Sequence, residues 1–169
     1  MKKVKKIWLL GTAGQGVGNA TPVAEFNVLQ DPQATEILLN SGIPIEIIGW
    51  DLALDDRTYF YYNDLSILSN GSEAGKFLTK AFSKLAANKL MQNGRLYIDA
   101  ADPIAMAACI WPDYIKEKKI CYAYCCADIN YPPVYGQVVF FDKDVRYDQL
   151  DDEEIKEVDI SALLLMKGY

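Results

Sequence analysis

Residues 18–34, GNATPVAEFNVLQDPQA, lie between two apolar runs and decide the fold of this part of the chain. The runs that flank them, Val4–Leu10 and residues 45–50 (IEIIGW), have the apolar character of buried parallel strands. Between the runs, Thr21-Pro22 and Asp31-Pro32 each pair a capping side chain with a proline at the first helical position. The order strand, helix, strand predicts a βαβ unit.

The two predicted helices of this unit differ in length. The first begins at Pro22, carries Glu25 and ends near Asn27. The second begins at Pro32 and ends at Gly42, and it repeats apolar or small residues at helical spacing. The polar residues of the first helix therefore follow the carboxyl end of a predicted strand.

A longer amphipathic helix is predicted over residues 73–93, where Asn93-Gly94 ends it. One face of this helix carries the small or apolar residues Ala74, Phe77, Leu78, Ala81 and Leu85.

The remaining signals predict a helix that begins at Asp102-Pro103, strands at residues 119–126 and 135–142, and a closing helix within residues 147–169. The predicted fold is α/β, with a mostly parallel, Rossmann-like open sheet and flanking helices. Residues 1–169 are predicted to form a single domain, because the length fits one domain and no linker is visible.

Composition excludes several kinds of partner. A formal net charge of -6 makes a nucleic-acid backbone an unfavourable ligand. No segment approaches the ~20 apolar residues of a membrane span. The four cysteines form no CxxC pair, and the chain has no histidine, so no zinc motif is present. Reduced, structural thiols and a cytoplasmic location are expected.

The glycine-rich turn at residues 11–18 does not fit a phosphate-binding loop. GxGxxG would need a glycine where Asn19 stands, and GxxxxGK[ST] fails at Val17. Gly11 and Gly14 are explained by a tight turn, whereas Gly18 lies against the polar group of Asn19 and its neighbours.

Three blocks resemble the inosine-uridine-preferring nucleoside hydrolases. They are residues 18–52 (GNATPVAEFNVLQDPQATEILLNSGIPIEIIGWDL), 102–113 (DPIAMAACIWPD) and 135–142 (YGQVVFFD), and they occur in the family's order. The resemblance covers the C-terminal half of the family fold only, and the AEFN...DP combination is its most specific part.

This resemblance implies hydrolysis of the N-glycosidic bond of a ribonucleoside to ribose and free base, an N-glycosyl hydrolase activity of EC 3.2.2 type, with a calcium ion at the carboxyl edge of the sheet. By motif position, Asn19, Glu25 and Asn27 would contact the ribose hydroxyls, and Asp102 would be a calcium ligand. Carboxylates and amides suit sugar hydroxyls, and hard Ca²⁺ prefers oxygen ligands. Capping of a helix is an alternative explanation of Asp102.

The sequence departs from the family in two ways. The aspartate-rich, DxDPGxDD-like motif that supplies most calcium ligands in the family is absent. Ala101 stands where members active on purines commonly carry a histidine that protonates the leaving base. Tyr59, Tyr61 and Tyr62 are candidates for protonating the base or lining its pocket, but packing or an interface is the more usual explanation of such an aromatic run.

Two hypotheses of different class follow. In the first, the chain is the C-terminal half of a ribonucleoside hydrolase, as a fragment, a product of a split or frame-shifted gene, or one subunit of a two-chain enzyme. It then needs the N-terminal half, which a separate polypeptide could carry. In the second, it is a degenerate, inactive domain that binds ribose or nucleoside or that oligomerises; an inert remnant is the third alternative. A bared sheet edge favours association, so a homo-oligomer is expected.

Overall fold

The computed structural model describes residues 3–141 and 160–164. The contacts of the chain cluster in two compact units. The first comprises Met1–Leu52 and Ala101–Tyr169, and the second comprises Ala53–Ala100. Each unit is described by itself. The expectation of a single domain over residues 1–169 stays a prediction.

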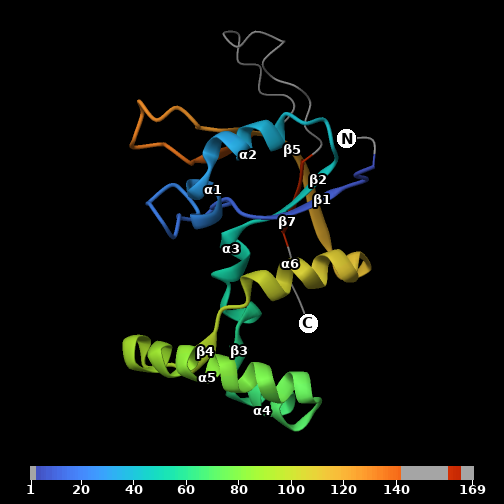
Figure 1. Ribbon diagram of the computed structural model, residues 1–169, viewed down its shortest axis with the longest axis vertical. Helices are drawn as coiled ribbons and strands as arrows, with labels where there is room; N and C mark the ends of the chain where they lie inside the picture. The colour runs from blue at the N-terminus through green and yellow to red at the C-terminus, as the bar shows by residue number, and fades with distance from the viewer. Residues whose placement is uncertain (1–2, 142–159, 165–169) are drawn as a thin grey trace. The chain divides into compact units, whose positions relative to one another are not determined.

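The first unit is built on a five-stranded sheet of order β1-β2-β7-β5-β6. β1 pairs with β2 and β2 with β7 in parallel, whereas β5 is antiparallel to both β7 and β6 (Figure 1). The predicted α/β fold class is confirmed. The strands are β1 (Ile7–Leu10), β2 (Ile45–Ile48), β5 (Glu117–Cys125), β6 (Val138–Phe141) and β7 (Ile160–Leu164).

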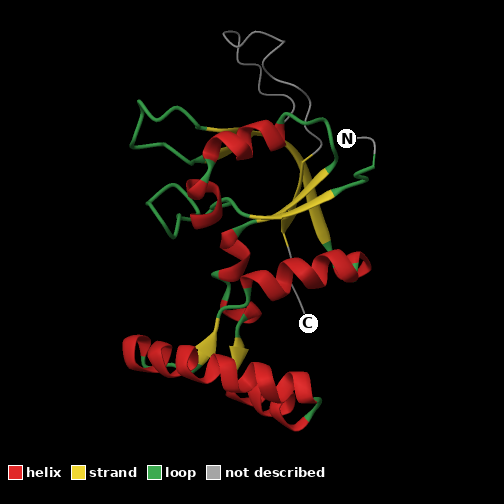
Figure 2. Cartoon of the chain, viewed as in Figure 1, coloured by secondary structure: helices red, strands yellow, loops and turns green. Residues whose placement is uncertain are grey.

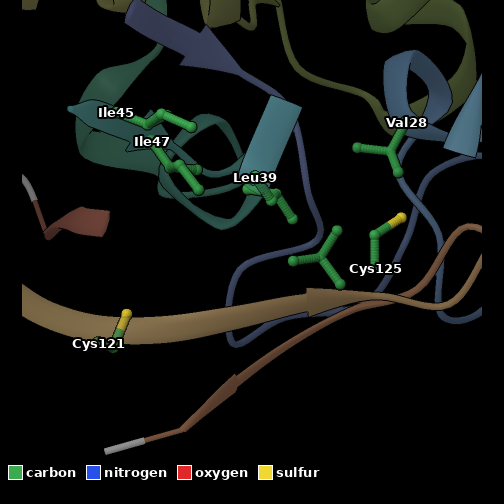
Figure 3. Close-up of a cluster of buried hydrophobic side chains, with 7 residues drawn as sticks. Val28, Leu39, Ile45, Ile47, Cys121 and Cys125 are labelled. Atoms are coloured by element: carbon green, nitrogen blue, oxygen red, sulfur yellow. The ribbon is translucent and has the colours of Figure 1, made fainter. Parts of the chain in front are cut away.

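Helices cover both faces of this sheet, so β2 is buried on both sides. Its residues Ile45 and Ile47 point to a core that includes Val28 of α1 and Leu39 of α2 (Figure 3). Ile48 points to a second core with Ala108 of α6. The helical segments of this unit are α1 (Phe26–Gln30), α2 (Pro32–Leu39), α3 (Trp50–Ala53, whose last residue begins the second unit), α6 (Ala101–Ile110) and the short 3-10 turn Pro112–Tyr114.

The structure corrects the predicted start of the first helix. Glu25, not Thr21, caps α1, which begins at Phe26. The Thr21 hydroxyl accepts hydrogen bonds from the N–H groups of Val23 and Ala24 at 3.3 and 2.9 Å, so it closes a turn instead. Asp31, in contrast, caps α2 as predicted, accepting from the Ala34 N–H at 2.9 Å.

The predicted closing helix is also corrected. Residues 160–164 form β7, a central strand between β2 and β5. The rest of the predicted closing helix lies outside the described residues. The apolar sequence ISALLL at residues 160–165 is compatible with a buried strand as well as with a helix, and hydrophobic periodicity alone does not separate the two.

The second unit consists of two short antiparallel strands and two helices (Figure 2). They pack around a small core of Leu65, Ala86 and Ile98. Its longest helix confirms the predicted bounds, with Ser72 as N-cap and Gly94 at φ 69° after the last residue. The elements are a 3-10 turn (Asp56–Thr58), β3 (Phe60–Tyr61), α4 (Tyr62–Asn70), α5 (Glu73–Asn93) and β4 (Tyr97–Ile98).

The apolar face predicted for α5 is not the face that packs. The side of α5 that carries Gly75 and Ala86 is buried, whereas Phe77 is 71% exposed. Gly75 explains this orientation: a Cβ there would lie 2.2 Å from the Leu68 carbonyl oxygen, so only glycine lets α4 approach so closely. Within the described residues, no helix is both long and apolar enough to cross a membrane.

Candidate functional site

A cavity of about 260 Å³ opens at the carboxyl end of β1 in the first unit. All four binding residues predicted from sequence line it, and so does Ala101. Parallel strands of α/β proteins present their ligand sites at this edge. The lining residues are Leu10, Asn19, Glu25, Phe26, Asn27, Trp50, Ala101 and Asp102.

Glu25 is held rigidly although it is a buried carboxylate, only 4% exposed. One oxygen, Oε2, accepts hydrogen bonds from the N–H groups of Asn27 and Val28 at 2.9 and 3.3 Å. Two orphan donors of α1 are thereby satisfied, and the helix N-terminus favours the negative charge. The other oxygen accepts no hydrogen bond from any described residue, so it remains able to bind a ligand.

The two asparagines are oriented by backbone partners. Asn19 Oδ1 accepts from the Phe26 N–H at 2.7 Å, which leaves the Asn19 amide N–H₂ as a donor. Asn27 Nδ2 donates to the Leu10 carbonyl at 3.3 Å, which leaves the Asn27 amide oxygen as an acceptor. The three residues line the same cavity, and between them they keep one donor, one acceptor and one carboxylate oxygen without a hydrogen bond to the described chain.

Gly18 shapes the loop that carries Asn19. Its N–H donates to the Pro22 carbonyl at 3.1 Å. A Cβ at Gly18 would lie 2.2 Å from the carbonyl oxygens of both Thr21 and Ala24. The loop folds so tightly on itself that only glycine fits, and this tight fold brings Asn19 to the amino end of α1.

Asp102 lines the cavity from the second sequence segment of this unit, which begins at Ala101. It is the second residue of α6, so it lies inside the first turn and not at the cap, and the capping explanation is wrong. Its exposed carboxylate makes no hydrogen bond to the described part of the chain. It therefore remains available to a ligand.

These residues do not by themselves fit a calcium ion. Ca²⁺ takes six to eight oxygen ligands. Within residues 3–141 and 160–164 there is no group of three or more Asp, Glu, His or Cys side chains that could hold a metal. Among the described residues, Glu25 and Asp102 supply the only carboxylates that line this cavity.

Sequence reasoning missed the apolar walls of the cavity. Phe26 is 55% exposed and lies beside Glu25, and Trp50 follows β2 after the single residue Gly49. The signal was present for Trp50, because residues after the carboxyl ends of parallel strands line such sites. No such signal was present for Phe26. Its place in the cavity wall follows from its position as the first residue of α1, directly after the capping residue Glu25.

The tyrosines considered for a base pocket belong to the second unit. Tyr59 and Tyr61 line a cavity of about 400 Å³ with Asp56, Arg95 and Tyr97, whereas Tyr62 is 67% exposed at the start of α4. The rings of Tyr59 and Tyr97 stack with centroids 4.4 Å apart. Burial raises the pKa of Tyr59, so its phenol is protonated at neutral pH. Packing and cavity lining thus coexist here.

Comparison with known proteins places these features in a family. The sequence pattern of the inosine-uridine preferring nucleoside hydrolases matches residues 1–163. The pyrimidine-specific ribonucleoside hydrolase RihB of Escherichia coli O1:K1 is 32% identical over 143 residues, which cover 82% of this chain and 43% of that protein.

Solved structures agree with the sequence match. A plant nucleoside hydrolase, PpNRh1, superposes with a TM-score of 0.80 and 28% identity over 95% of this chain and 49% of that one. The purine-preferring ribonucleoside hydrolase from Gardnerella vaginalis has the same fold, with a TM-score of 0.73 at 24% identity, over 95% of this chain and 48% of its own. The chain thus spans about half the length of these relatives. It belongs to the inosine-uridine preferring nucleoside hydrolase family.

Proposed function

We propose that the cavity at the carboxyl end of β1 binds the ribose of a ribonucleoside, and that the protein contributes this site to hydrolysis of the N-glycosidic bond. The observation that carries the proposal is that Asn19, Glu25, Asn27 and Asp102 line one cavity. They come from two segments far apart in sequence, so their meeting is a property of the fold.

The free groups of the cavity match the chemistry of a sugar. Ribose hydroxyls both donate and accept, and Asn19 offers a donor where Asn27 and Glu25 offer acceptors. Phe26 supplies an apolar wall for the C–H face of the ring. A volume of about 260 Å³ lies below the roughly 300–1,000 Å³ usual for drug-sized ligands, so it suits a sugar better than a whole nucleoside.

Two carboxylates in this cavity suit bond cleavage as well as binding. Departure of the base leaves a ribosyl group with oxocarbenium character, as in other glycoside hydrolysis. Negative charge fixed close to the ring stabilises that positive charge. Glu25 is the better placed of the two, because its hydrogen bonds to α1 hold it in one position without reorganisation.

Calcium binding at this cavity would require further ligands in addition to Asp102. Asp102 would supply one carboxylate to the ion, and the remaining ligands would come from outside the described residues. A bound Ca²⁺ can activate a water molecule as the nucleophile. The residues described here would then bind and orient the ribose and stabilise the developing charge.

The free edge of β1 is the proposed route for those ligands. Among the described residues, β1 pairs only with β2. Ile7 and Gly11 donate towards that neighbour, so the backbone groups of Trp8 and the Leu10 N–H point outward, whereas the Leu10 carbonyl already accepts from Asn27 Nδ2. A parallel strand added there, from a separate polypeptide carrying the N-terminal half or from a longer form of the protein, would end beside Asn27 and Asp102.

Similarity to a pyrimidine-specific relative favours uridine over inosine as the substrate. Ala101 has no proton to give to a leaving base. Protonation would therefore come from another group or from water. The homo-oligomer and the cytoplasmic location predicted from sequence are retained as parts of the proposal.

The test is release of base from uridine and inosine with Ca²⁺, with the chain alone and with a polypeptide carrying a DxDPGxDD-like motif. The proposal predicts activity in the mixture and its loss in Asp102→Ala. Absence of activity in the mixture, or Asp102→Ala with full activity, refutes the catalytic part.

A second candidate function is binding without chemistry, favoured by the incomplete set of metal ligands. Calorimetry with ribose and uridine in excess EDTA separates the two. Metal-independent binding that Asn27→Ala weakens, with no base release in any mixture, supports the binding function. If neither ribose nor uridine binds, in Ca²⁺ or in EDTA, the cavity is an inert remnant.

A further inference from the structure

We propose that the open face of α5 docks an amphipathic helix whose flank is acidic, supplied by another polypeptide. The open face is defined as Ala74, Phe77, Leu78, Ala81 and Leu85. This inference concerns the second unit alone and does not depend on the proposed function of the cavity.

The open face has the spacing of a helix–helix contact. Its residues recur at intervals of three and four along α5, which places them on one stripe. Phe77, Leu78 and Leu85 are 71%, 41% and 40% exposed, although this stripe is apolar. It adjoins the packed side of α5 at Phe82, so a helix laid along it would extend the core of the unit.

The shape of the open face favours a helix over a lipid surface. Ala74 and Ala81 are exposed, seven residues apart, and lie on the midline of the stripe between the bulky side chains. Small residues on a midline with large ones around them form the holes that accept the knobs of a second helix. Helices that insert into a lipid surface present bulky apolar residues there instead.

A row of lysines sets the charge of the partner. Lys76, Lys80 and Lys84 recur every four residues along the margin of the open face next to Phe77. Lys76 is paired with Glu73 at 2.6 Å. Lys80 and Lys84 make no ion pair with any described residue, so their charges are available to carboxylates on a docked helix.

A second copy of α5 does not supply those carboxylates. A twofold axis that relates two antiparallel helices puts the same margin of each helix on the same side, so one lysine row would face the other. A parallel twofold pair would oppose each lysine row with the margin of Leu78 and Leu85, which is apolar. Like charges in such positions are destabilising. A homo-oligomer is therefore expected to use another surface.

The experiment measures binding of two synthetic peptides by fluorescence anisotropy at low salt. Both have the length of α5 and a seam of leucine and alanine; one carries glutamate along its flank and the other lysine. The glutamate peptide is expected to bind about tenfold more tightly, as two added ion pairs imply. Equal affinity for the two peptides, or no binding of either, overturns the proposal.

Matched variants locate the contact. Leu78→Ser is expected to weaken the glutamate peptide, whereas Leu90→Ser, 46% exposed on another side of α5, is not. Lys80→Glu with Lys84→Glu is expected to reverse the preference, and the same change of charge at Lys3 and Lys5 is not. Circular dichroism checks that each variant keeps its helix content. Equal effects of the paired variants count against the open face.

Two further measurements test the alternative occupants of the open face, a membrane and a second copy of the chain. Vesicles of phosphatidylserine and phosphatidylcholine that bind the chain while the glutamate peptide does not would assign the face to a membrane. A dimer in sedimentation that Leu78→Ser dissociates would assign it to a second copy. Either result overturns the proposal.

Discussion

Glu25 and Asn27 are joined by a hydrogen bond of 2.9 Å from the Asn27 backbone N–H to Glu25 Oε2. A single carboxylate therefore both caps α1 and lines the cavity, and only one of its two oxygens accepts hydrogen bonds from α1. Because the cap needs an accepting oxygen whereas a ligand also gains from the negative charge, substitutions can separate the two roles.

Glu25→Gln is expected to keep most of the stability and lose most of the ligand affinity, because an amide oxygen still accepts from α1 but carries no charge. Glu25→Ala is expected to lower the free energy of unfolding by about 0.5–2 kcal/mol, the usual cost of a lost cap. Urea unfolding and ribose calorimetry on both variants measure the two effects. Equal stability of the Gln and Ala variants would show that Glu25 does not act as a cap.

Gly18→Ala is expected to destabilise the first unit and to displace Asn19, since a Cβ would lie 2.2 Å from two carbonyl oxygens. A loss of about 1–3 kcal/mol is usual for such overpacking. Gly42→Ala is the control, because a Cβ there meets nothing within 4 Å and only its φ of 69° resists the change. Gly18→Ala should weaken ribose binding in calorimetry, and Gly42→Ala should not.

The ion pairs of Glu46 with Lys6 and Lys118 lead us to expect that the protein loses stability in acid. Burial acts to raise the pKa of this β2 carboxyl, but hydrogen bonds and charges from Lys118, at 2.7 Å, and from Lys6 hold it below its ordinary value of 4.5. A lowered folded pKa means that its stabilisation is complete above about pH 4.5 and is lost as pH falls through the folded value.

Glu46→Gln is therefore expected to lower stability near pH 7, by about 1–3 kcal/mol for lost charge-assisted hydrogen bonds, and to flatten the decline below pH 4.5. Thermal unfolding as a function of pH measures both effects. Glu117→Gln, on an exposed residue of β5, serves as the control. A profile of Glu46→Gln parallel to that of the unmodified protein would contradict the assignment.

The thiols are expected to differ in reactivity. All four cysteines are free; Cys109 is exposed, and Cys121 and Cys125 are buried. Burial raises the pKa of Cys125 to about 12, and its Sγ donates to the Pro32 carbonyl at 3.4 Å. Thiolate is the reactive form, so maleimide at neutral pH should label Cys109 first and Cys125 last. Mass spectrometry of Cys109→Ser should show that the fast phase has gone.

Local signals predicted the elements whose ends are set by local chemistry. Asp31-Pro32 located α2, and Gly94 located the end of α5, because capping and positive φ involve only neighbouring residues. Thr21-Pro22 misled, since Glu25 satisfies the first donors of α1 and leaves Thr21 to a turn. Two competing caps are not ranked by sequence alone.

The features that depend on tertiary packing could not be predicted. The side of α5 that is buried was decided by Gly75, which admits α4 closely, and not by the more apolar stripe. Residues 160–164 became a strand because β2 and β5 pair on either side of them. Motif position did place Asn19, Glu25, Asn27 and Asp102, and the fold brings all four to one cavity; their roles stay predictions.

The second unit lies in the sequence between the two segments that line the cavity, Leu10–Trp50 and Ala101–Asp102. This order has a consequence in time. At synthesis rates of about 5–20 residues per second, Asn19, Glu25 and Asn27 precede Asp102 on the ribosome by several seconds. A nascent chain can therefore cap α1 while the cavity still lacks its second carboxylate. The site is completed late, only after the whole second unit has been made.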